Sequence, residues 1–168
     1  MPVAILAGLA GPLWREAAGL AAPVPTDRIV LTGTRELDEK EEALLRSTEV
    51  RIVSASELRD NGALAEAIAR LGRRCSLLYL HVDLDVLDPR FVPSASTPSA
   101  NGLTIAELVS VMAAVLESGK VAAVAMSSLN PGAGARGERS VASAMKTLEE
   151  ALPAWKTIPG VESAAVTR

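Results

Sequence analysis

The chain has 168 residues, of which 49% are hydrophobic and 2% aromatic, and its formal net charge is −3 at pH 7. That length suits one compact domain over residues 1–168, and the high apolar content excludes a disordered chain. The acidic balance and the few aromatic side chains exclude a nucleic-acid-binding surface. No apolar run reaches the roughly 20 residues of a membrane span, and the apolar start lacks the basic region of a signal peptide. We therefore expect a cytoplasmic protein with neither nucleic-acid nor membrane partners.

Metal and disulfide chemistry is bounded by two residue counts. The chain contains one cysteine, Cys75, and one histidine, His81. A single cysteine excludes a disulfide framework and a zinc site built from cysteines. A single histidine excludes a self-contained metal site rich in histidine.

Five short aliphatic runs are predicted strands. In chain order they cover residues 3–7, 28–32, 50–53, 77–82 and 121–126. The run at 77–82 is almost continuously apolar, and continuous hydrophobicity is typical of parallel strands that are covered on both faces.

Amphipathic segments between these runs are predicted helices, at residues 13–18, 38–46, 63–71, 104–118 and 138–152. The segment at 104–118 is the clearest, because Thr104 and Glu107 form a capping-box pattern in which each side chain can satisfy an exposed amide of the other residue. Gly119 and Pro153 are suitable ends for the last two helices. The alternation of strands and helices predicts a three-layer α/β/α sandwich with a mostly parallel sheet.

An aspartate-rich segment, His81-Val82-Asp83-Leu84-Asp85-Val86-Leu87-Asp88-Pro89, begins in the strongest predicted strand. Alternation sends Asp83 and Asp85 to the same face if the strand geometry continues. Two carboxylates there repel each other and are costly to desolvate, so a divalent cation that neutralises them favours the pair. The alternative is that they only cap the strand end and bond loop amides. Asp88 is predicted to shape the turn through bonds to backbone amides.

Two irregular stretches, residues 83–102 and 127–137, both follow predicted strands. Binding sites in open α/β sheets form just beyond the carboxyl ends of the strands. Functional residues are therefore expected in these two loops.

From Asp83 onward the sequence resembles the third signature of the ureohydrolases, the family of arginase, agmatinase and formiminoglutamase. The matching residues are Asp83-x-Asp85, Pro89, Pro93, Ser94, Thr97-Pro98 and Gly102-Leu103-Thr104. Further on, Asn130-Pro131 resembles the Glu-x-Asn-Pro segment of that family, and residues 28–42 resemble its strand followed by Gly-x-Arg. The resemblance covers about residues 25–152 and is to the C-terminal half of a ureohydrolase.

The resemblance implies a binuclear manganese hydrolase that acts on linear amidines. Asp83 would bridge two Mn²⁺ ions and Asp85 would bind one of them. Two metals about 3.5–4 Å apart would hold a hydroxide that attacks a guanidinium carbon. His81, Asp88 and Thr97 are interpreted as residues that support the ligands or shape the loop. A packed core position and direct ligation of the metal are the alternatives for His81, and direct ligation is the less favoured of them.

Two departures from the family pattern limit this interpretation. The remaining family ligands lie in an earlier Asp-Ala-His-x-Asp segment and a separate His, and neither occurs in this chain. Ser128 and Asn130 are candidates for the substrate loop. However, Ser128 aligns with the family's Glu that pairs with the substrate guanidinium, and a serine cannot supply that charge. A site with Asp83 and Asp85 alone is short of ligands for two ions.

Three hypotheses follow. The first is a ureohydrolase domain with an incomplete site, inactive or weakly manganese-binding alone, for which a partner chain supplies the missing N-terminal half. The second is a non-catalytic domain for assembly or regulation, since low charge and alanine-rich helices suit a homo-oligomer. The third is a haloacid-dehalogenase-type phosphatase with Asp83 as nucleophile and Asp85 as acid/base, although no Asp follows Asp88 to bind magnesium.

Overall fold

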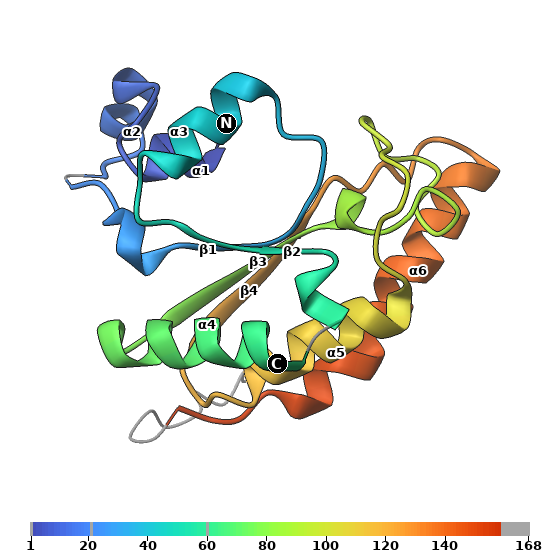
Figure 1. Cartoon of the computed structure of the whole chain (residues 1–168). Coiled ribbons are helices and arrows are strands. Elements are labelled where there is room, and N and C mark those ends of the chain that lie inside the picture. The colour runs from blue at the N-terminus through green and yellow to red at the C-terminus, as the bar shows by residue number, and fades with distance from the viewer. Residues whose placement is uncertain (1, 21, 60, 159–168) are drawn as a thin grey trace. The chain divides into compact units, whose positions relative to one another are not determined.

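A computed structural model describes residues 2–20, 22–59 and 61–158 of the chain (Figure 1). Its internal contacts divide the chain into two compact units. One comprises residues 1–31 with 37–52, and the other comprises residues 32–36 with 53–168. The prediction of a single domain stays a prediction.

The first unit is mainly helical and has little core. It contains α1 (Pro2–Leu6), α2 (Pro12–Ala17), a 3₁₀ turn (Thr26–Arg28) and α3 (Glu39–Arg46). Among its described residues only Ala7 is buried, whereas Leu13 and Trp14 are 76% and 74% exposed. β1 (Val30–Thr34) begins in this unit and pairs with β2 (Arg51–Ser54).

The predicted strand at residues 3–7 is wrong, because this run forms helix α1. The Ala7 N–H donates to the Val3 carbonyl at 2.9 Å, a helical bond, and Gly8 ends the segment with a φ of +73°. Val3 and Leu6 are each more than a third exposed. A short apolar run does not distinguish a buried strand from a helical turn by its periodicity.

The second unit carries a parallel strand pair and the main core. β3 (Leu78–Asp83) and β4 (Val121–Ser127) pair in parallel, from Leu78 opposite Val121 to Asp83 opposite Ser127. The helices of this unit are α4 (Asn61–Arg74), α5 (Ile105–Leu116) and α6 (Ala135–Ala151), with 3₁₀ turns at Glu57–Arg59, Leu84–Val86 and Leu152–Ala154. Figure 1 shows α5 and α6 side by side next to the two strands. Their shared core consists of Leu78, Val82, Leu84, Leu87, Val92, Leu103, Leu108, Met112, Leu116, Val121, Ala144 and Ala151.

The predicted α/β class is confirmed, and the other four strands and all five predicted helices are present within a few residues of their expected bounds. Within the described residues the strands form two separate pairs, β1–β2 and β3–β4, rather than one sheet. None of the helices in these ranges combines the length and apolarity that a membrane crossing requires.

β3 is covered on one face only, contrary to the expectation of cover on both. Leu78 and Val82 are buried in the core with α5 and α6, whereas Tyr79, His81 and Asp83 point the other way and are exposed. Tyr79 is 60% exposed. Buried and exposed side chains therefore alternate along β3, as in a strand with one covered face, although the sequence of β3 is almost continuously apolar.

The predicted capping box at the start of α5 is confirmed. The Glu107 N–H donates to Thr104 Oγ1 at 3.2 Å, and the Thr104 N–H donates to Glu107 Oε2 at 2.7 Å. The bond from Thr104 and a further one from the Arg59 guanidinium lower the pKa of Glu107. This cap fixes the point at which the loop after β3 ends and α5 begins.

Gly102 allows the chain to close that loop. The Asp88 N–H donates to the Leu103 carbonyl at 3.0 Å, and the Leu103 N–H donates to the Val86 carbonyl at 2.9 Å. A Cβ on Gly102 would overlap the backbone at Leu87 and Asp88. Only glycine lets two backbone segments approach this closely, which explains its place in the signature.

Replacing Gly102 by Ala should lower the free energy of unfolding by about 1–3 kcal/mol, because backbone must move to admit the methyl group. Urea unfolding monitored by circular dichroism measures the loss. The control is Gly62→Ala near the start of α4, where an added Cβ meets nothing within 4 Å. That variant should be neutral or up to about 1 kcal/mol more stable. Equal effects of the two substitutions would contradict the close-approach explanation.

Candidate metal centre

Asp83 and Asp85 flank a buried leucine at the end of β3. Asp83 is the last residue of the strand, and Asp85 lies in the 3₁₀ turn that follows it. Leu84, between them, is 0% exposed and belongs to the core. Because the Leu84 side chain is directed inward, the two neighbouring carboxylates are left outside the core at the carboxyl end of the strand.

The two carboxyl groups are close enough to affect each other's charge. Burial raises the pKa of Asp85, the negative charge of Asp83 raises it further, and a hydrogen bond with the Asp83 carboxyl acts in the same direction. Thr97 opposes these effects, since its Oγ1 donates to Asp85 Oδ2 at 3.2 Å. The two carboxyl groups thus lie beside each other, and Thr97 contacts one of them; the supporting role of Thr97 stays a prediction. That the pair binds a metal stays a prediction.

Asp88, for which a turn-shaping role is predicted, makes short-range contacts in the turn that follows the carboxylate pair. Its Oδ1 accepts a hydrogen bond from the Arg90 N–H at 3.2 Å, and the Arg90 guanidinium lies 3.5 Å from the same oxygen. The Asp88 carbonyl accepts the Phe91 N–H at 2.9 Å. These bonds form a tight turn directly after the carboxylate pair.

Serine hydroxyls fasten the same loop to α6. Ser94 Oγ donates to Ser140 Oγ at 2.7 Å, and both serines are buried. Ser143 Oγ donates to the Phe91 carbonyl at 2.7 Å. A loop held at two points on a packed helix has little freedom to move the carboxylates that it carries.

His81 is not a packed core residue, because its side chain is exposed on the outer face of β3. Its Nε2 lies 2.9 Å from Ser127 Oγ and its Nδ1 lies 3.3 Å from the Tyr79 hydroxyl. Ser127 is the residue of β4 that lies opposite Asp83. His81 is thus linked to the neighbourhood of Asp83 through Ser127, and its role as a supporting residue stays a prediction.

The loop after β4 begins beside the carboxylate pair. Ser128 and Asn130 are both exposed, and Ser128 has a left-handed backbone with a φ of +62°. Gly137 at the start of α6 packs so closely on Pro131 that a Cβ there would overlap its carbonyl. In Figure 1 the loops that follow β3 and β4 lie at the same end of the strands, as the parallel register requires. Ser128 and Asn130 therefore lie in the predicted loop, and their contact with a substrate stays untested.

Arg35 is a residue of this site that the sequence analysis did not single out. Its guanidinium donates to the carbonyls of Asp85 at 2.6 Å and Val86 at 3.0 Å. The only signal was its position in a Gly-x-Arg segment. Its partners are 50 and 51 residues further along the chain, so no local pattern identifies them.

The donors in the structure do not fit a two-metal centre. Within residues 2–20, 22–59 and 61–158, no three or more His, Cys, Asp or Glu side chains are grouped so that they could hold a metal ion. Asp83 and Asp85 offer oxygen ligands, which suit one hard divalent cation such as Mn²⁺. A second ion would need ligands from elsewhere.

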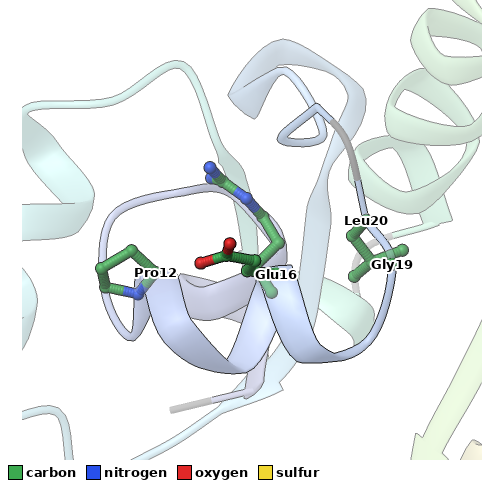
Figure 2. A pocket seen from close by; sticks show the side chains of 5 residues that line it. Pro12, Glu16, Gly19 and Leu20 are labelled. Carbon is green, nitrogen blue, oxygen red and sulfur yellow. The ribbon is translucent and has the colours of Figure 1, made fainter.

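Two surface hollows are lined by other residues. One of about 400 Å³ lies along α2, and Figure 2 shows Pro12 and Leu20 at its opposite ends with Glu16 between them. The other, of about 640 Å³, is lined by residues of α4 and α5, including Ile68 and Val111. None of the predicted site residues lines either hollow.

Comparison with known proteins identifies the family. The pattern of the arginase family matches residues 9–153. The chain belongs to the arginase family. It is 34% identical over 110 residues to the arginase of Bacillus caldovelox, covering 64% of this chain and 37% of that one. It is 31% identical over 137 residues to the arginase of Neurospora crassa, covering 78% and 38%.

Solved structures of the arginase family have the same fold. The arginase structure from Bacillus caldovelox matches with a TM-score of 0.74 and 30% identity, over 88% of this chain and 50% of that one. An arginase structure from Bacillus subtilis matches with a TM-score of 0.80 and 24% identity, over 90% and 52%. The chain thus has the arginase-type α/β fold and spans about half the length of these relatives. Family membership favours the ureohydrolase interpretation of Asp83-Leu84-Asp85 over the phosphatase one.

The raised pKa of Asp85 has a consequence for stability. Because the folded state disfavours the ionised carboxyl, this group's contribution to stability is complete below its unfolded pKa of about 3.9 and is lost as the pH rises through the higher folded pKa. Asp85→Asn removes the ionisation, so its free energy of unfolding relative to the wild type should increase as the pH rises from 3 to 7. Urea unfolding in metal-free buffer measures this difference.

The matched control is Glu66→Gln at an exposed position of α4. It also removes one carboxylate, but away from the buried surroundings of Asp85 and the charge of Asp83. A difference between Asp85→Asn and the wild type that is constant with pH, or that falls as the pH rises, would contradict the assignment.

Proposed function

We propose that this chain provides the carboxylate half of a ureohydrolase site. Asp83 and Asp85 would contribute ligands for manganese-dependent hydrolysis of a guanidino or related C–N bond, once the remaining ligands are supplied. The observation that carries the proposal is the placement of both carboxylates beside each other at the carboxyl end of β3, in a loop held by Thr97 and Arg35. Since the donors present do not complete a two-metal centre, no hydrolytic step is assigned to the chain alone.

By the resemblance, Asp83 would bridge two Mn²⁺ ions and Asp85 would bind one. The exposure of Asp83 and the partial burial of Asp85 support this division, because a bridging carboxylate must be open to ligands from other segments. The proposal does not extend to arginine as substrate. By the same resemblance, Ser128 would stand at the guanidinium-pairing position, and a serine has no charge, so the proposed substrate class stays at guanidino or related C–N compounds.

The missing ligands would come from a polypeptide equivalent to the N-terminal half of the relatives. Two features support this. The chain spans about half the length of the solved relatives. The outer face of β3, with Tyr79, His81 and Asp83, is exposed, although parallel sheets are normally covered on both faces. A homo-oligomer, in which a second copy covers this face, is the alternative arrangement.

The second candidate function is a non-catalytic domain for assembly or regulation. The observation that favours it is the absence of any larger ligand cluster around Asp83 and Asp85 in the described residues. The two candidates differ in one requirement. Only the ureohydrolase proposal needs the carboxylates to be charged, so the double substitution Asp83→Asn, Asp85→Asn separates them.

Co-expression tests the ureohydrolase proposal. The chain would be produced with the N-terminal half of a relative that carries the Asp-Ala-His-x-Asp segment, such as the Bacillus caldovelox arginase. The complex should bind two Mn²⁺ ions by elemental analysis after gel filtration and release urea or ammonia from members of a panel of guanidino and formimino compounds. The double Asn variant should form the same complex and lack both properties. Unchanged metal content in that complex would refute the ligand roles.

Melting temperature in the presence and absence of manganese gives a simpler test on the chain alone. Without metal, Asp83→Asn should raise the melting temperature slightly, because repulsion with Asp85 is removed. With Mn²⁺ present, the same substitution should lower it relative to the wild type, because binding to the folded state is lost. Circular dichroism measures both shifts, with Glu66→Gln as the control. Identical shifts in the two conditions would show that the pair binds no metal.

A further inference from the structure

Arg35 connects the end of β1 to the turn that carries Asp85. Both of its terminal nitrogens donate to backbone carbonyls. Nη1 donates to Val86 at 3.0 Å and to Gly33 at 3.3 Å, and Nη2 donates to Asp85 at 2.6 Å and to Ser99 at 3.3 Å. One side chain therefore joins three chain segments, all within the second unit.

These contacts depend on the geometry of the guanidinium group. Its planar fork can hold several acceptors at fixed angles, whereas a lysine ammonium is a compact point charge. The Arg35 Nε is buried and has no hydrogen-bond partner among the described residues. An unsatisfied buried donor lowers stability, so the four carbonyl bonds must offset that cost for this conformation to persist.

The next residue holds the same loop by a second route. The Glu36 carboxylate accepts a hydrogen bond from Ser99 Oγ, while Arg35 donates to the Ser99 carbonyl. Glu36 has a left-handed backbone with a φ of +51°. Such a conformation costs about 1–3 kcal/mol in a residue other than glycine and persists where the surroundings impose it. Adjacent residues thus hold both the backbone and the side chain of Ser99.

The contacts of Arg35 leave the carboxylates available. All four described bonds end on carbonyl oxygens, so the guanidinium determines the course of the backbone without occupying an oxygen of the Asp85 carboxylate. Its positive charge also attracts the Asp85 carboxylate. Without Arg35, the carbonyls of Asp85 and Val86 would lose these hydrogen bonds. The backbone of the turn could then move, and the orientation of the Asp85 side chain would no longer be fixed.

We propose that Arg35 is a positioning residue for the carboxylate pair. By holding the carbonyls of Asp85, Val86 and Ser99, it orients the Asp85 carboxylate beside Asp83 for a divalent cation. This inference rests on the proposed function for the identity of the ligand, Mn²⁺. The order that Arg35 imposes on the loop is independent of any metal.

Amide hydrogen exchange and manganese binding on the full chain test the proposal together. The variants are Arg35→Met, Arg35→Lys and, as the control, Arg139→Met at an exposed position of α6. In both Arg35 variants the amides of Leu87, Asp88 and Leu103 should exchange at least about tenfold faster, with α6 amides unchanged. Mn²⁺ affinity, measured by the electron paramagnetic resonance of the free ion, should fall about 10- to 100-fold, as for other residues that orient metal ligands.

Each other outcome has a definite meaning. Wild-type exchange rates and Mn²⁺ affinity in Arg35→Met would overturn the proposal. So would faster exchange spread equally over the loop and α6, since that would show a general effect on stability. Full restoration of both properties by Arg35→Lys would show that charge, and not the fork of hydrogen bonds, is what matters. Faster loop exchange in Arg35→Met, with no Mn²⁺ binding by the wild type, would support positioning of the loop and refute the cation site.

Discussion

Two like charges held beside each other are the constraint around which the second unit is built. Asp83 and Asp85 repel each other, and burial of Asp85 adds to the cost of its charge. A free loop would relieve that repulsion by moving the side chains apart. Here Leu84 is fixed in the core between them, and Gly102 lets the far end of the loop close against the turn. The two carboxylates stay close despite their repulsion, because the packing of Leu84 and the closure of the loop at Gly102 fix the backbone on either side of Asp85.

The structure keeps this arrangement with polar groups drawn from distant parts of the chain. Arg35 holds the turn from the end of β1, and Ser94 is joined to Ser140 of α6. Close carboxylates with a raised pKa are typical of functional sites, and this is the basis of our proposal of a cation site. The outer face of β3, which carries Asp83, is exposed in this chain.

Much of this organisation was predictable from local patterns. The capping box at Thr104 depends on two residues three positions apart, and it is as expected. The strand predicted at residues 3–7 is a helix, because a short apolar segment has the same composition in a strand and in a helical turn. The expected cover of β3 on both faces is absent for a different reason. Continuous hydrophobicity predicts cover on both faces, yet the second face of β3 is exposed in this chain.

The role of Arg35 could not be predicted, because its partners in the Asp85 turn and at Ser99 lie at least 50 residues away and are backbone carbonyls, which carry no sequence signal. Family membership likewise establishes the fold and the origin of the Asp83–Gly102 signature. It does not establish activity, since the chain spans about half the length of the solved relatives it matches.

Metal stoichiometry of the chain by itself tests the central claim most directly. Titration with Mn²⁺, followed by electron paramagnetic resonance, distinguishes single ions from the coupled pair that a two-metal centre produces. We predict weak binding of a single ion that Asp83→Asn and Asp85→Asn each abolish, with no coupled signal. Two tightly bound and coupled ions in the chain alone would contradict the proposal that it carries only the carboxylate half of the site.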